Sequence, residues 1–217
     1  SMSILPYFLK RVVSMRSFDN SYSTYKYIIP LLLDAPDYEL RSSIYAMFHC
    51  LDNFMNTIML ELGRINTSNS KLKNMANRRV EKFEERLWFT TLWADYYFFL
   101  NTTERTYRLA MNLYDKLCLP EKSKEIRESK VFNEARLMRN KIEHIYEGLS
   151  KQGEYFSQQY GSMGENNEIE IDGISFEANE TSLQPLYQIY EDISKIITER
   201  YITPNRELVD RIWKNVL

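Results

Sequence analysis

With 217 residues, 44% of them hydrophobic, the chain is long enough to bury one sizeable core, and we expect a single domain spanning residues 2–217. The chain has few glycines and prolines, 6 of each. This scarcity argues against a turn-rich all-β fold and favours an all-α fold of long helices. Residues 152–194 contain nine acids and no basic residue. Removing those nine from the 30 acids leaves 21 against 28 basic residues, so the rest of the chain, at about +7, permits a polyanionic ligand.

The sequence does not predict export or membrane insertion. The apolar stretch 4–9 contains a proline and is followed, rather than preceded, by basic residues, unlike a signal peptide. The richest apolar stretch, 87–100, contains a carboxylate and is shorter than the ~20 residues that span a bilayer. We therefore expect a cytoplasmic protein without a membrane partner, in which Cys50 and Cys118 are reduced and buried. Two histidines and no cysteine cluster argue against a structural zinc site.

Hydrophobic periodicity predicts two long helices in the first half of the chain. In residues 37–62 apolar side chains recur every three or four positions, and Gly63 suits the C-terminal end of this helix. Residues 65–69 are expected to form a polar loop. A second helical pattern covers 70–119, and residues 101–103 are a candidate interruption of it.

The second pattern contains a run of aromatic side chains that could either stack nucleic-acid bases or pack in a core. Its members are Trp88, Phe89, Trp93, Tyr96, Tyr97, Phe98 and Phe99. Aromatic residues at helical spacing favour core packing. The basic residues between Lys71 and Arg86 are interrupted by glutamates, which favours a solvated helix face over an RNA path. His49, between apolar neighbours, is expected to be partly buried and hydrogen-bonded.

The region 152–180 reads as an acidic insertion in the helical chain. Residues 155–167 are rich in Gly, Ser and Gln and predict a loop. Apolar residues then alternate around Asp172-Gly173, which is a strong signal for a β-hairpin. A helix over 182–201 and a short terminal helix over 205–215 complete the predicted bundle of long antiparallel helices with a small β-hairpin.

A helix predicted over 121–149 carries the residues of chemical interest. Its apolar seam consists of Val131, Ala135, Met138, Ile142, Ile145 and Leu149. On a helical wheel Asn140 and His144 lie about 160° from Ile142, and Arg139 about 60° from the seam. The simplest interpretation is a solvated histidine and an ordinary i,i+4 ion pair between Arg139 and Glu143, worth a few tenths of a kcal/mol.

Two features argue for more than a solvated surface. Leu137 shares the outward face with Asn140 and His144, as a second packing interface would require. Residues 139–146, Arg-Asn-Lys-Ile-Glu-His-Ile-Tyr, also resemble the signature of HEPN domains, in which Arg and His are four to six residues apart and a polar residue often follows the Arg. The trailing His-x-Tyr is similar to the toxin branch that pairs with minimal nucleotidyltransferase antitoxins. The chain is longer than that branch and carries the acidic hairpin.

The resemblance implies a metal-independent endoribonuclease, active as a homodimer without a cofactor and serving as a toxin or in anti-phage defence. Two copies of the motif helix would face one another across one cleft and cleave RNA by attack of the ribose 2′-OH. His144 would act as acid and base, since its reference pKa lies near neutral pH, and Arg139 would bind the phosphate. Asn140 and Glu143 would orient these groups. Tyr146 would flank the site, where an antitoxin modifies the equivalent residue with AMP.

Two alternatives remain open. A HEPN bundle can also be a non-catalytic binding or dimerisation module that partners a nucleotidyltransferase or another effector, with the acidic hairpin as a docking surface. The other alternative is a helical bundle that serves only in interaction. It predicts that Arg139 and His144 are scattered in solvent, away from any dimer cleft.

Overall fold

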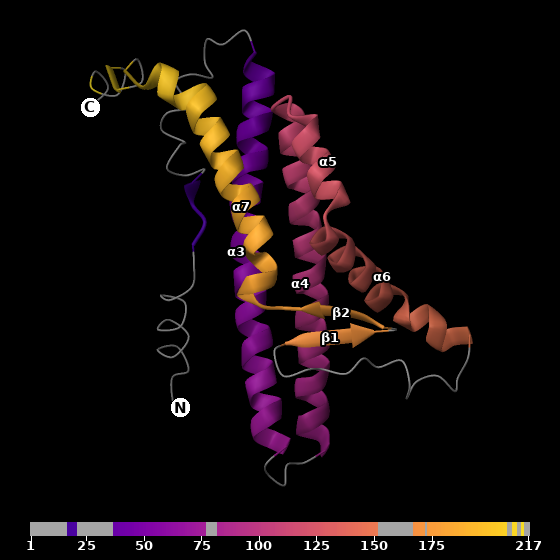
Figure 1. Ribbon diagram of the computed structural model, residues 1–217. Helices are drawn as coiled ribbons and strands as arrows, with labels where there is room; N and C mark the ends of the chain where they lie inside the picture. The colour runs from indigo at the N-terminus through magenta and orange to yellow at the C-terminus, as the bar shows by residue number, and fades with distance from the viewer. Residues whose placement is uncertain are drawn as a thin grey trace.

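The computed structural model describes residues 17–20, 37–76, 82–151, 167–171, 173–207, 210–211 and 214. Two long helices, α3 (Tyr38–Ala76) and α4 (Lys82–Lys116), run side by side in opposite directions (Figure 1). Helix α7 (Glu180–Ile197) packs against them, and α5 (Pro120–Glu128) and α6 (Lys130–Lys151) lie along another side of α4. The predicted all-α architecture of long antiparallel helices is confirmed. None of the helices that the structure describes has a stretch sufficiently long and apolar to span a bilayer.

Apolar stripes at helical spacing hold α3 and α4 together. The buried stripe of α3 consists of Phe48, Leu51, Met55, Ile58, Leu62 and Ile65. The stripe of α4 includes Leu92, Tyr96, Phe99, Leu100 and Tyr107. Burial of each large apolar side chain contributes about 1.5–3 kcal/mol, which is more than the helix propensity of any single residue. The predicted core role of the aromatic run is therefore confirmed for Tyr96 and Phe99, whereas Phe89 and Phe98 are exposed on α4.

The polar loop predicted at 65–69 is wrong, because α3 continues through Gly63 to Ala76. Ile65 is fully buried, and the buried hydroxyl of Ser68 donates a hydrogen bond of 3.2 Å to the Asp95 carboxylate on α4. A glycine inside a helix costs about 1 kcal/mol, which the burial of an isoleucine offsets. The polar residues of this segment therefore belong to helix contacts rather than to a turn. The second helix, predicted to begin at residue 70, begins instead at Lys82 as α4, because residues 70–76 still belong to α3. The predicted interruption at 101–103 is absent from this continuous helix.

The helix predicted over 121–149 is in fact two helices. Ser129 has an extended backbone (φ −67°, ψ 140°), which ends α5 and begins α6. Its hydroxyl accepts a hydrogen bond of 3.3 Å from the backbone N–H of Phe132, as an N-cap side chain does. The break allows Ile126 of α5 and Phe132 of α6 both to be buried.

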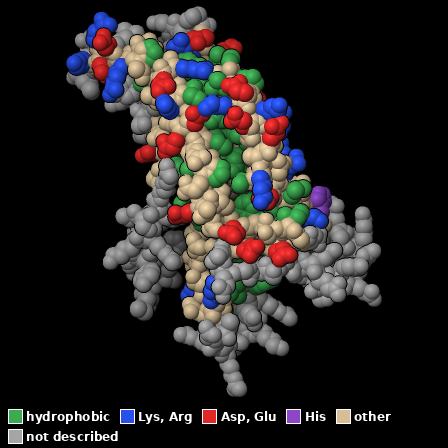
Figure 2. All heavy atoms as spheres, in the orientation of Figure 1, with side chains coloured by type: hydrophobic (Ala, Val, Ile, Leu, Met, Phe, Trp, Pro, Cys, Tyr) green, Lys and Arg blue, Asp and Glu red, His purple; other side chains and the backbone are tan. Residues whose placement is uncertain are grey.

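The predicted β-hairpin is confirmed. Strand β1 (Glu168–Ile171) pairs antiparallel with β2 (Ile174–Glu177), and Gly173 takes the positive φ of 73° that the turn requires. The buried side of the hairpin packs on α4, where the rings of Phe176 and Phe99 lie 6.3 Å apart. The exposed side is acidic, and Figure 2 shows carboxylates gathered over this part of the molecule.

Asparagines anchor the start of the hairpin to α3. The side-chain amide of Asn167 donates hydrogen bonds to Asn66 (2.6 Å) and to the Ala178 carbonyl (3.1 Å). Asn69 donates a further hydrogen bond to the Asn167 side chain. The insertion is thereby fixed against the helix pair. Apart from Asn167, the loop predicted at 155–167 lies outside the described residues.

The predicted C-terminal helix is confirmed as α7, which continues as a π-helical turn (Thr198–Ile202) and a 3₁₀ turn (Thr203–Asn205). The Tyr190 hydroxyl donates a hydrogen bond of 2.7 Å to the buried carboxylate of Asp52, which joins α7 to α3. Phe18 packs edge-on against the same tyrosine, with ring centroids 4.8 Å apart. The terminal helix predicted at 205–215 falls only partly within the described residues.

The burial predicted for both cysteines and for His49 is wrong. Cys50 and Cys118 are exposed free thiols, and His49 is exposed beside Tyr45, with ring centroids 6.5 Å apart. The reason on α3 is geometric, because successive residues of a helix are separated by about 100°. Leu51, which is 1% exposed, occupies the core position, so its two predecessors point outward.

Candidate functional site

The two faces of α6 divide as the sequence predicts. Ala135, Met138 and Ile142 of the apolar seam are buried, whereas the side chains of Ile145 and Leu149 are outside the described part of the chain. On the outward face Leu137 is 43% exposed, Asn140 is half-buried and His144 is exposed. The face therefore combines an exposed leucine with polar side chains. The Tyr146 side chain is not among those the structure describes.

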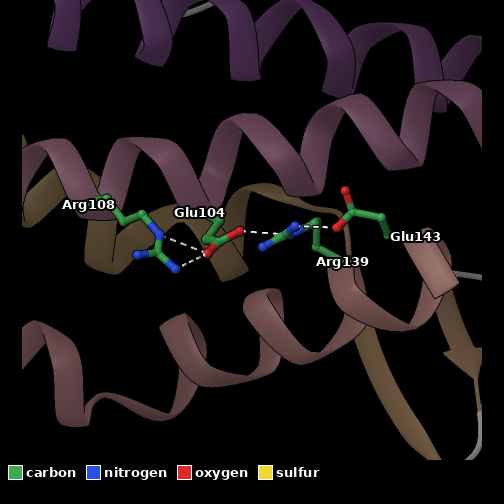
Figure 3. A network of polar contacts seen from close by, with 4 residues as sticks. All are labelled: Glu104, Arg108, Arg139 and Glu143. Carbon is green, nitrogen blue, oxygen red and sulfur yellow. Dashed lines mark hydrogen bonds and ion pairs between the residues drawn. The ribbon is translucent and has the colours of Figure 1, made fainter.

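Arg139 is directed at α4 rather than at solvent. Its Nε donates a hydrogen bond of 2.8 Å to Oε2 of Glu104, and its Nη1 pairs with the Glu143 carboxylate one turn further along α6 (Figure 3). The arginine side chain retains 21% exposure. The predicted Arg139–Glu143 pair is thus present, but as the outer part of a larger network.

Glu104 is the centre of this network. Its side chain is only 3% exposed, and Arg108 donates two hydrogen bonds to Oε1, of 2.8 Å from Nε and 2.7 Å from Nη2. Figure 3 shows the order Arg108–Glu104–Arg139–Glu143, with two cations and two anions in alternation. The four side chains together carry no net charge. Charge-assisted hydrogen bonds of this kind are short and hold a planar guanidinium in one orientation.

The surroundings of Arg139 keep it charged. Burial lowers the pKa of its guanidinium, but the hydrogen bonds and negative charges of Glu104 and Glu143 outweigh burial and raise the pKa above its ordinary value. Among the described residues, no acceptor is recorded for its Nη2 group. Among the described residues, the Nη2 group is therefore the part of this permanently charged guanidinium that no carboxylate occupies.

His144 follows Arg139 by five residues, which places it about 140° further around the helix. Within one chain the guanidinium is thus turned toward α4 while the imidazole is exposed. Asn140 lies one turn before His144 on the same face. A site that uses the imidazole and the guanidinium on one substrate therefore needs that substrate to lie across the border between these two faces.

Glu104 is the site residue that the sequence interpretation missed. It directly follows residues 101–103, the predicted interruption of α4, in a polar stretch where Thr103 and Thr106 are also buried. The signal available in the sequence was its i,i+4 spacing to Arg108 in a segment that has few other charges. That spacing does not reveal that a second arginine, 35 positions away, would reach the same carboxylate.

A second buried polar cluster joins α3 and α4. Burial raises the pKa of Glu61, and the charge and hydrogen bond of Arg64 only partly oppose it, while the Asp95 carboxylate adds to the increase. Burial likewise raises the pKa of Asp95, against the hydrogen bond from Ser68 and the charge of Arg64. In the described part of the chain, no three His, Cys, Asp or Glu side chains are grouped so as to hold a metal ion.

Comparisons of this chain with protein-family models, with curated proteins and with solved structures give no match.

Proposed function

We propose that the chain is a HEPN-type, metal-independent endoribonuclease whose homodimer forms a composite site from two copies of α6. The observation that supports this proposal is the outward face of α6. Leu137 is 43% exposed there, beside the exposed His144, while buried Glu104 fixes Arg139 at the border of the face. An exposed leucine within a polar face is suited to an interface between two copies.

The proposed chemistry uses the two groups in different roles. His144 removes the proton from the ribose 2′-OH in one half of the site, and the second copy of His144 protonates the leaving 5′-oxygen. Arg139 contacts the phosphate through its Nη2 edge, while Nε and Nη1 remain bound to their carboxylates. Asn140 and Glu143 orient the imidazole and the guanidinium, and Tyr146 flanks the site. No cofactor enters this mechanism.

One observation favours the second candidate, a non-catalytic HEPN module that binds an effector such as a nucleotidyltransferase. Glu104 and Glu143 together neutralise Arg139 and Arg108, so one chain offers little excess positive charge for a phosphate. A purely structural network would have the same geometry. The exposed acidic side of the hairpin would then be the docking surface for such a partner.

The test is cleavage of single-stranded RNA by the purified protein in EDTA. We expect wild type to give products that end in 2′,3′-cyclic phosphate, and His144→Ala to leave the RNA intact. His49→Ala is the matched control, because it removes the other exposed histidine, on α3. If wild type and His144→Ala leave the RNA equally intact, the catalytic assignment is wrong. Copurification with a second protein, without cleavage after separation, would support the non-catalytic module.

The proposed role as a toxin or in anti-phage defence rests on the resemblance of residues 139–146 alone. A cognate nucleotidyltransferase that transfers AMP to Tyr146 would support the toxin branch. The measurement is the mass increase of the purified protein after incubation with that enzyme and ATP, with Tyr146→Phe as the control.

A further inference from the structure

The outer face of α4 has a charge pattern unlike the rest of the helix. We define this face by its exposed side chains Leu87, Ala94, Phe98, Arg105, Arg108 and Asn112. Between Leu87 and Asn112 the helix contains two acids, Asp95 and Glu104, and both are buried. The only exposed charges on this stretch are therefore the two arginines.

The six residues share one side of the helix. Leu87, Ala94, Phe98 and Arg105 are seven, four and seven residues apart, and these spacings keep side chains on one face. The opposite side is occupied by the core residues that pack on α3. The 25 steps from Leu87 to Asn112, at 1.5 Å per step, give a face about 38 Å long.

The aromatic and basic parts of this face are both accessible. Phe98 is 52% exposed and contacts the partly buried ring of Tyr97 edge-on, with centroids 5.7 Å apart. Arg105 lies two helical turns further along, and no ion pair to it is recorded among the described residues. A ring that can stack a base is therefore followed by a guanidinium that can bind a phosphate.

This face continues into the candidate site. Arg108 is one turn beyond Arg105, and it shares the Glu104 carboxylate with Arg139 of α6 (Figure 3). A strand on the α4 outer face thus passes beside the arginine to which the proposed mechanism assigns the phosphate.

We infer that the α4 outer face binds single-stranded RNA, with Phe98 stacking a base and Arg105 and Arg108 contacting phosphates, and that it leads the strand to Arg139. This inference deepens the proposed function and rests on it for the direction of the strand. The physical basis is that proteins bind single strands through exposed aromatic rings combined with basic groups, without sequence preference. Exposed Leu60 on α3 is not included, because the exposed arginine one turn further along, Arg64, is paired with Glu61.

The experiment measures binding separately from cleavage. The probe is a fluorescein-labelled, 2′-O-methylated single-stranded oligoribonucleotide of about 12 nucleotides, which cannot be cleaved by 2′-OH attack. Fluorescence anisotropy gives Kd at several salt concentrations for the full chain. The variants are Phe98→Ala and Arg105→Ala, and the controls are Leu60→Ala, also at an exposed apolar residue, and Lys195→Ala, at an exposed cation of α7.

We expect Phe98→Ala to weaken binding by about fivefold to a hundredfold, as loss of one stacked base does, without changing the salt dependence. Arg105→Ala should lower the slope of log K against log salt by about 0.7, the value for one phosphate of a single strand. The two controls should bind as wild type does.

The outcomes separate the two proposals. If Phe98→Ala and Arg105→Ala bind the probe as tightly as the controls, the RNA path is wrong, even if His144-dependent cleavage stands. If both variants weaken binding but wild type does not cleave unmodified RNA, the path stands and the nuclease proposal fails. If the variants change self-association and not RNA binding, the face is an interface between copies and the inference is overturned.

Discussion

Glu104 shows how one buried carboxylate can determine the direction of a functional side chain. It receives three charge-assisted hydrogen bonds, two from Arg108 and one from Arg139, so its burial is compensated. Arg139 would otherwise have several rotamers open to it, since a long side chain at the border of a helix face is weakly constrained. Glu104 is therefore a positioning residue for Arg139.

Glu104→Gln should destabilise the protein by about 1–3 kcal/mol, because it leaves two guanidinium groups without their shared anion. The cost stays below that of a fully buried pair, since Arg108 is 55% and Arg139 21% exposed. Urea denaturation measures it. Glu128→Gln, which removes an exposed i,i+4 pair with Lys124, should change stability by less than about 0.5 kcal/mol. Equal effects of the two variants would contradict the stabilising role of the network around Glu104.

The buried acids Glu61 and Asp95 affect how the free energy of unfolding depends on pH. The sign is opposite to that of a carboxylate whose pKa is lowered on folding. Their pKa values in the folded protein lie above the ordinary values of 4.5 and 3.8. Between the ordinary and the raised pKa the folded state binds more protons than the unfolded state. Their contribution to the free energy of unfolding is therefore present at low pH and is lost as pH rises through the raised values.

Glu61→Gln should accordingly become more stable relative to wild type as pH rises from about 4 to 7. The measurement is the urea midpoint of Glu61→Gln minus that of wild type across this range. We expect this difference to become steadily more positive as pH rises. The groups that face Glu61 are Arg64 on its own helix and Asp95 on α4. A flat difference across the range would show that burial of Glu61 does not affect its titration.

At the scale of elements, the hairpin depends on one backbone conformation. Gly173 has φ of +73°, and a Cβ at this position would meet no atom within 4 Å. Gly173→Ala should therefore cost about 1 kcal/mol through backbone strain alone. Gly173→Asn should cost less, because asparagine adopts the left-handed conformation more readily. Equal unfolding free energies for the two variants in urea would contradict this explanation.

Local signals predict the elements well where the pattern is local. The hairpin around Gly173 and the seam through Met138 depend on neighbours in sequence, and both were predicted. The C-terminal end of α3 and the beginning of α6 were not predicted, because tertiary contacts determine where these two helices end and begin. Gly63 and Ser68 favour a turn locally, but burial against α4 keeps the helix intact.

The candidate site shows the same division. The outward direction of His144 and the ion pair between Arg139 and Glu143 both follow from helical spacing, and both are present. The Arg139–Glu104 bond depends on how α6 lies against α4, which the break at Ser129 determines. No spacing rule within one helix contains that information.

At the scale of the whole molecule, the proposed nuclease depends on two copies of the chain meeting along α6. One chain places Arg139 toward α4 and His144 toward solvent, so the proposed site requires a second α6 to complete it. The outward face of α6 supplies an apolar contact at Leu137, which is 43% exposed. A contact through this residue between two parallel copies of α6 would place the two imidazoles at the same level, about two turns beyond it.

Leu137→Glu should therefore convert a dimer into monomers and abolish RNA cleavage, while it changes the free energy of unfolding of the monomer by less than about 0.5 kcal/mol. Sedimentation velocity gives the oligomeric state, and urea denaturation shows that the variant folds. Leu60→Glu is the matched control, because Leu60 is 51% exposed on α3, away from α6. If Leu137→Glu remains dimeric, or if wild type is a monomer that still cleaves RNA, then the α6 face is not the interface and the composite site is wrong. If the wild type is a monomer and does not cleave RNA, the chain is better explained as an interaction module. Exposed Leu137, beside an Arg139 whose charge is neutralised by Glu104 and Glu143, would then bind a partner rather than form a catalytic site.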